Sequence, residues 1–178
     1  MLAPAPGIEI EIVASSAMQD LRLREADIAI RHARPEHSDL IGKKIGETTA
    51  HLYAAKHYLD RVGRPEQPID LVDYDFIGFE TAERLLDLYN GFGIPLTREN
   101  FKVYSASGPV IVSLLKSGLG IGIATKDIEH QESELEMVLP ELPAIEVPVW
   151  LVTHRELRTS PRIQLVFEVI ATYLTERP

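Results

Sequence analysis

The 178-residue chain contains no cysteine. This absence excludes disulfide bonds, thiolate zinc sites and cysteine nucleophiles, and it suits a reducing compartment such as the cytoplasm. No apolar run approaches the roughly 20 residues that cross a membrane. Residues 1–7 also lack the basic and apolar regions of a signal peptide. We therefore expect a soluble, cytoplasmic protein that does not contact a membrane.

Positive charge is scarce as well. The 18 Lys and Arg residues against 27 Asp and Glu give a formal net charge of −9. An acidic surface repels phosphate groups, so this chain by itself is not expected to bind DNA or RNA. The hydrophobic and charged fractions, 45% and 25%, are those of an ordinary globular protein, and the length is that of one domain, which can consist of two small lobes.

Predicted strands and helices alternate along the chain. The period-two pattern of residues 8–13 predicts a strand with one face in water, and the apolar run 26–30 predicts a strand covered on both faces, as in parallel sheets. Further extended segments are expected at 40–49, 51–55, 75–79, 101–104, 121–124, 135–139 and 147–153, and helices at 18–25, 56–61, 82–90, 108–117 and from 161 onward. The alternation predicts an α/β fold of the doubly wound type, in which ligands bind beyond the carboxyl ends of strands.

Two helices carry finer expectations. Thr81 is a plausible N-cap, and Gly91 fits the position just after the end of the helix that follows it. The last helix is expected to bury a stripe at helical spacing that consists of Val166, Val169, Ile170, Tyr173 and Leu174.

The glycine-rich residues 118–122 resemble a phosphate-binding loop only superficially. Such a loop follows a strand and opens a helix, so that amide groups at the helix start face the anion. Here the order is reversed, because the glycines follow a predicted helix and lead into a strand. We expect a tight connection with close backbone packing.

Residues 104–108 lie between a predicted strand and a predicted helix. The glycine that a nucleophile elbow requires two positions before its serine is missing, so the signal for a serine hydrolase is weak. The serine hydroxyls and the amide groups of a helix start can bind an anion. A simple N-cap by Ser105 or Ser107 explains the same residues equally well, and the two interpretations are compatible.

Arg31 and His32 directly follow the predicted strand 26–30, where a ligand cleft of an α/β fold opens. A guanidinium at this place can hold a carboxylate through two hydrogen bonds. An exposed pair, or an ion pair with Glu25 or Asp27, is the competing interpretation. The six histidines show no ligand spacing supported by carboxylates, so neither a metal nor another cofactor is expected.

Several short stretches, taken in their order and spacing, resemble the effector-binding domain of LysR-type transcriptional regulators. They are EADIAIR at 25–31, LYAA at 52–55, YL at 58–59, GRP at 63–65, GLGIGI at 118–123, Leu135 with VLP at 138–140, PVWLV at 148–152 and SPR at 160–162. The resemblance spans nearly the whole chain.

This resemblance implies a two-lobed fold like that of periplasmic binding proteins, with a small effector held between the lobes. Two crossing segments would lie near 49–53 and 148–152, so that lobe I comprises 1–50 with 151–178 and lobe II comprises 51–150. The effector contacts of the family would fall on Arg31, His32, Thr48, Thr49, Phe79, Glu80, Thr81, Ser105, Ala106, Ser107 and Gly108.

The chain departs from the family pattern at its start. The winged helix-turn-helix and linker helix are absent, and residues 6–10 resemble the second strand of the family domain, so its first strand and helix are also missing. We expect an unpaired strand edge around 8–13 and 26–30, or an edge filled by another chain. A homodimer or higher oligomer is expected, with DNA bound only through a helix-turn-helix outside this chain.

Three functions remain in view. The leading hypothesis is a ligand-sensing regulatory domain that binds a small anionic metabolite. The alternative is a stand-alone small-molecule binding or interaction protein without a DNA-binding partner. An enzyme, such as a serine hydrolase that uses Ser107, is a distant third.

Overall fold

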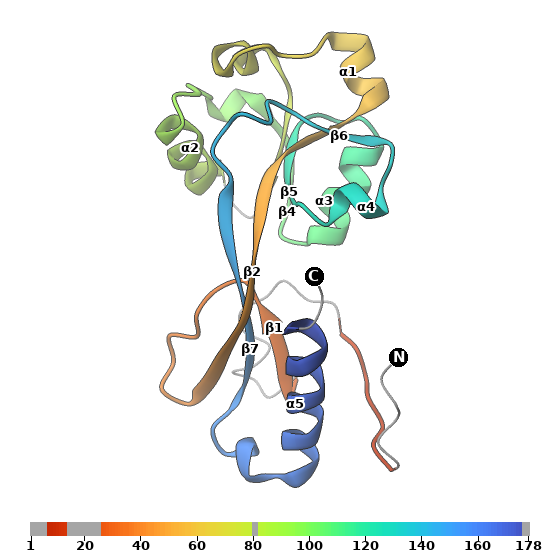
Figure 1. The fold of residues 1–178 in the computed structure, drawn as a ribbon. Helices are drawn as coiled ribbons and strands as arrows, with labels where there is room; N and C mark the ends of the chain where they lie inside the picture. The colour runs from red at the N-terminus through yellow and green to blue at the C-terminus, as the bar shows by residue number, and fades with distance from the viewer. Residues whose placement is uncertain (1–6, 14–25, 80–81, 176–178) are drawn as a thin grey trace. The chain divides into compact units, whose positions relative to one another are not determined.

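The computed structural model describes residues 7–13, 26–79 and 82–175 (Figure 1). Contacts divide the chain into two compact units: unit 1 extends to Thr48 and resumes at Val147, and unit 2 runs from Thr49 to Glu146. The strands β2 (Leu40–Ala55) and β7 (Ile145–His154) each continue from one unit into the other, and they are neighbours in one sheet. Both were predicted as extended segments, and the predictions are confirmed.

The larger sheet has the strand order β1-β7-β2-β5, and β6 also pairs with β2. Its further members are β1 (Ile28–Arg31), β5 (Gly122–Thr125) and β6 (Leu135–Met137). The pairs β1/β7, β2/β5 and β2/β6 are antiparallel. In the second sheet, β3 (Phe76–Phe79) pairs in parallel with β4 (Phe101–Ser105).

The prediction of a parallel strand buried on both faces at 26–30 is therefore wrong. The strand β1 pairs antiparallel with β7, and Ile30 is 51% exposed. Such a short apolar run shows that the segment is extended but carries no information on the direction of its neighbour. A strand at the edge of a sheet also lacks the second neighbour that would help to cover it.

Residues 8–13, predicted as a strand, form none in the structure. Ile10, Ile12 and Val13 are 62%, 89% and 63% exposed. Alternation of apolar and polar residues forms a strand only where a neighbour offers hydrogen bonds, and among the described residues none does so here. Among the residues that the structure describes, β1 pairs only with β7, which agrees with the expected unpaired edge at 26–30. The predicted helix at 18–25 lies outside the described residues.

The predicted helices in the described ranges are present. They are α1 (Lys56–Val62), α2 (Ala82–Gly91), α3 (Gly108–Lys116) and α5 (Pro161–Thr175), joined by a short α4 (Ile128–Gln131) and by 3-10 turns at Pro68–Asp73, Arg98–Asn100 and Leu157–Thr159. Pro109 stands in the first turn of α3, where its missing N–H costs nothing, and Gly118 follows the helix in a left-handed conformation with φ +69°.

The end of α2 differs from the prediction. Gly91 is the last helical residue, and Gly93 takes the left-handed conformation with φ +75°. The N–H of Gly93 donates to the carbonyl of Asn90. A glycine inside a helix costs only about 1 kcal/mol, so its presence alone does not fix where a helix ends.

Unit 2 contains an extensive core in which α2, α3 and the two parallel strands meet. Phe76, Tyr89 and Phe101 form an aromatic cluster, with the rings of Phe76 and Tyr89 5.4 Å apart in an edge-to-face arrangement. At Gly120 a Cβ would lie 2.4 Å from the carbonyl oxygen of Asp75. The glycine-rich residues 118–122 thus form the expected tight connection between helix and strand.

Unit 1 is held by α5, which packs against the sheet. Its hydrophobic cluster contains three buried residues, Ile45, Leu151 and Ala171, and Ile28, Val149, Phe167, Ile170 and Leu174 pack around them. The predicted stripe on α5 is therefore right for Ile170 and Leu174 but wrong for Tyr173, which is 39% exposed. This helix carries apolar residues on more than one face, so spacing alone does not orient it.

Candidate functional site

In unit 1, Arg31 ends β1 and lies directly opposite Trp150 of β7. Paired residues project to the same face of a sheet, so both side chains lie on the face away from Leu151 and α5. The guanidinium of Arg34 stands 5.9 Å from the centroid of the Trp150 ring. The Trp150 indole N–H is buried and has no hydrogen-bond partner.

Gly42 makes room for this arrangement. A Cβ at Gly42 would lie 2.7 Å from Cγ of Pro35 and 3.1 Å from Cε3 of Trp150. The loop that contains Arg34 and Pro35 therefore packs directly on β2 and on the indole. His32, which follows Arg31, is exposed. The result is a cationic and aromatic cluster at the carboxyl end of β1.

Thr48 and Thr49 are the two residues of β2 between which the chain passes from unit 1 to unit 2. Both are half-buried. The Thr49 hydroxyl lies 3.2 Å from Nε2 of His51, which is the next residue on the same face of the strand. Polar side chains at this place thus belong to a strand shared by both units.

In unit 2 the structure brings five predicted residues to one edge of the parallel sheet. Phe79 and Ser105 are paired at the carboxyl ends of β3 and β4, and Ser107 and Gly108 open α3 directly afterwards. Ala106 joins the two serines. Phe79 is 38% exposed. Glu80 and Thr81, predicted beside Phe79, lie outside the described residues.

The serines define how α3 begins. Ser107 holds the N-cap position without a side-chain cap bond, whereas the Ser105 hydroxyl accepts the N–H of Ser107 at 3.1 Å. Pro109 has no N–H, so Gly108 and Val110 supply the amides of the first turn that helix geometry leaves without a partner in the helix. Together with the helix dipole, these amides favour a negative charge at the start of α3.

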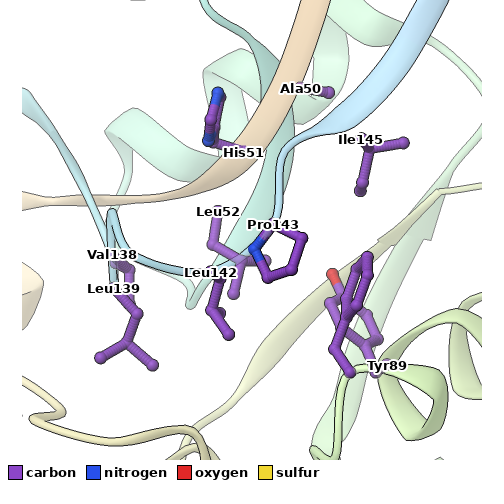
Figure 2. A pocket seen from close by; sticks show the side chains of 10 residues that line it. Ala50, His51, Leu52, Tyr89, Val138, Leu139, Leu142, Pro143 and Ile145 are labelled. Atoms are coloured by element: carbon purple, nitrogen blue, oxygen red, sulfur yellow. The ribbon is translucent and has the colours of Figure 1, made fainter.

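One feature was not foreseen from the sequence, a pocket inside unit 2 (Figure 2). It is lined by Ala50, His51, Leu52, Tyr89, Phe92, Val138, Leu139, Leu142, Pro143 and Ile145, and it contains none of the predicted site residues. Tyr89 lies within the helix that the sequence predicts at 82–90. A tyrosine that is spaced at a helical period from other apolar residues is expected in the core. Nothing in the sequence shows where its hydroxyl lies.

Metal chemistry finds no support in the described part of the chain, where no group of three or more His, Asp or Glu side chains could hold an ion. No helix of that part is long and apolar enough to cross a membrane.

Comparisons with known proteins give a consistent result. Residues 2–175 match the family described as LysR substrate binding domain. An uncharacterized HTH-type transcriptional regulator of Haemophilus influenzae is 32% identical over 146 residues, which are 79% of this chain and 50% of that protein. The HTH-type transcriptional activator AaeR of Escherichia coli is 25% identical over 181 residues, covering 99% of this chain and 59% of that protein.

Solved structures show the same fold. The regulatory domain of CrgA from Neisseria meningitidis has a TM-score of 0.76 at 21% identity, with 90% of this chain and 81% of that chain covered. The CcmR regulatory domain of Synechocystis PCC6803, solved in complex with 2-PG, has a TM-score of 0.67 at 17% identity, with 90% and 79% covered. The chain has the periplasmic-binding-protein-like α/β fold of these domains, and it spans about half of the curated relatives it matches.

Proposed function

Because the chain belongs to the LysR substrate-binding domain family, we propose that it senses a small anionic metabolite on behalf of a transcriptional regulator. Units 1 and 2 would be the two lobes, and β2 and β7 the two crossings. Relatives that carry a helix-turn-helix favour this role over that of a stand-alone binding protein. They are transcriptional regulators and not enzymes, so a hydrolase that uses Ser107 is not favoured either.

One observation carries the choice of an anion: each unit presents groups suited to a negative charge at the carboxyl end of a strand. In unit 1 these are Arg31 and, beyond it, His32. In unit 2 they are the Ser105 hydroxyl and the amides of Gly108 and Val110 at the start of α3. A guanidinium binds a carboxylate through two hydrogen bonds, and a helix start adds the favourable end of its dipole.

We propose that the metabolite acts by preferring one arrangement of the two units. A ligand shifts an equilibrium only by the difference between its affinities for the two states. In a longer regulator, the preferred arrangement would change how attached DNA-binding domains contact an operator. That regulator would work in the cytoplasm as a homodimer or higher oligomer, and DNA would be bound outside this chain.

A thermal-shift screen of small carboxylates and matched neutral compounds tests the proposal. We expect one or more acids to raise the melting temperature, because binding to the folded state stabilises it. In Arg31→Gln the affinity for that acid should fall at least tenfold, since a charge-assisted contact is worth about 1.5–3 kcal/mol. Arg162→Gln, a change at an exposed arginine of α5, should leave the affinity unchanged.

The outcome that contradicts an anionic ligand is equally specific. Stabilisation by neutral compounds with no response to any acid would rule it out. Equal loss of affinity in Arg31→Gln and Arg162→Gln would show that net charge, and not the place of Arg31 at the end of β1, governs the binding.

A further inference from the structure

The Tyr89 hydroxyl in unit 2 is buried and has no hydrogen-bond partner. The residue is 1% exposed, and its ring is fixed against the rings of Phe76 and Phe101 at centroid distances of 5.4 and 6.2 Å. Buried polar groups are nearly always paired with another protein group or with an ordered water molecule. Tyr89 is one of the residues that line the pocket, and Figure 2 shows its hydroxyl oxygen turned towards the side of Pro143.

The rest of the pocket is almost entirely apolar. Leu52, Phe92, Leu139, Leu142, Pro143 and Ile145 supply most of its wall. His51 is the other polar side chain of the lining, and its Nε2 already lies 3.2 Å from the Thr49 hydroxyl. Burial raises the pKa of the Tyr89 hydroxyl, so at neutral pH it is an uncharged donor. An apolar cavity with one neutral donor suits an uncharged ligand that offers one acceptor.

The pocket as it stands has a volume of about 20 Å³, which is room for about one water molecule. Its outer wall is formed by Leu142, which is half-buried, and Pro143, which is exposed. Both belong to residues 138–144, which form neither helix nor strand. The N–H of Val138 is bonded to the carbonyl of Leu52, and this fixes the inner end of the segment. Outward movement of Leu142 and Pro143 would enlarge the pocket without breaking a strand pair.

We propose that this pocket is a second binding site, for a small and largely apolar molecule with one carbonyl-type oxygen that accepts the Tyr89 O–H. It shares no residue with the predicted effector contacts. It also includes Ala50 and Ile145, which lie on the two strands that continue into unit 1. A molecule in the pocket would therefore contact both crossing strands directly.

Titration of the 178-residue chain with cyclopentanone, followed by amide NMR shifts, tests this site. We expect saturable shifts at Leu52, Leu139 and Ile145. Methylenecyclopentane has the same shape but no acceptor, and it should bind at least fivefold more weakly. Tyr89→Phe should weaken cyclopentanone binding at least fivefold and abolish the preference between the two probes, because only the donor is removed.

Two further variants keep the test decisive. Tyr104→Phe removes the hydroxyl of a tyrosine of the same unit that is 38% exposed and outside the pocket, and it should bind cyclopentanone like the parent chain. Leu142→Phe fills the pocket from its outer wall and should abolish the shifts even if Tyr89→Phe does not fold. Absence of saturable shifts in the parent chain, as expected if only water occupies the pocket, would overturn the proposal. Equal binding of cyclopentanone by the parent chain and Tyr89→Phe would do the same.

Discussion

Units 1 and 2 are built from the same kinds of element but differ sharply in how much apolar surface they bury. In the described ranges the core of unit 2 joins 21 buried residues, whereas that of unit 1 joins three, Ile45, Leu151 and Ala171. Buried apolar area is the main favourable contribution to folding. Unit 2 should therefore be the more stable unit, and unit 1 the one that opens first.

The largest expected effect comes from emptying each core in turn. Phe76→Ala in unit 2 should cost about 3–5 kcal/mol, because Phe76 is fully buried among Tyr89 and Phe101. Leu151→Ala in unit 1 should cost about 2–3 kcal/mol, since its partly exposed neighbours can move into the space. Urea unfolding, followed by circular dichroism and by the fluorescence of Trp150, separates the effects, because Trp150 is the sole tryptophan and reports on unit 1. A larger cost for Leu151→Ala would reverse the order of the two units.

Backbone packing gives the next largest contrast. Gly120→Ala in unit 2 should destabilise by about 2–4 kcal/mol, because φ is +151° and the added Cβ would meet the carbonyl oxygen of Asp75. Gly46→Ala, in the part of β2 that belongs to unit 1, should be neutral or stabilising by up to about 1 kcal/mol, since nothing lies within 4 Å of the added Cβ. Melting temperatures of the two variants measure the difference, and a similar loss in both would show that crowding at Gly120 is relieved by movement of the loop.

The smallest effect is an ion pair on the surface of unit 2. Arg64 donates two hydrogen bonds to Glu136, at 2.7 and 2.9 Å, and it lowers the pKa of that carboxyl. A carboxyl whose pKa is lower in the folded chain than in the unfolded chain stabilises the folded state at neutral pH. The stabilisation is fully present above the unfolded-state pKa of about 4.3, and it is lost as the pH falls through the folded-state pKa. Glu136→Gln should remove up to about 1 kcal/mol of stability at pH 7 and little at pH 3.

The exposed Glu141 provides the control for this comparison. Glu141→Gln should leave the stability at pH 7 unchanged. Urea unfolding at pH 7 and pH 3, followed by circular dichroism, gives the values. A pH dependence that survives in Glu136→Gln would assign the effect to other carboxylates.

Much of the fold was predictable wherever local signals agreed. Pro109 at the start of α3, Gly118 after its end and the apolar run of β7 located their elements, because turn chemistry and burial point there to the same structure. The errors lie where an element depends on a neighbour. The direction of β1, the missing strand at 8–13 and the buried face of α5 are all decided by what lies beside them, which no local pattern contains.

The candidate site likewise has one part that could be predicted from the sequence and one part that could not. The ends of β3 and β4 bring Phe79 and Ser105 together because parallel strands end at a common edge, and this follows from the order of elements. The Trp150 indole beside Arg34 and the hydroxyl of Tyr89 inside the pocket follow from side-chain packing between distant segments. Their chemistry was visible in the sequence, but their place was not.

The continuity of β2 across both units limits the kind of motion that the strand can transmit. Successive side chains of a strand point to opposite faces, so a shift of one residue against β7 would turn every buried side chain of β2 outward. Sliding of β2 along β7 would therefore expose the buried side chains of β2. Bending and twisting of the strand keep every residue opposite its partner. A conformational change transmitted along β2 is therefore a bend or a twist of the strand, and not a displacement of β2 along β7.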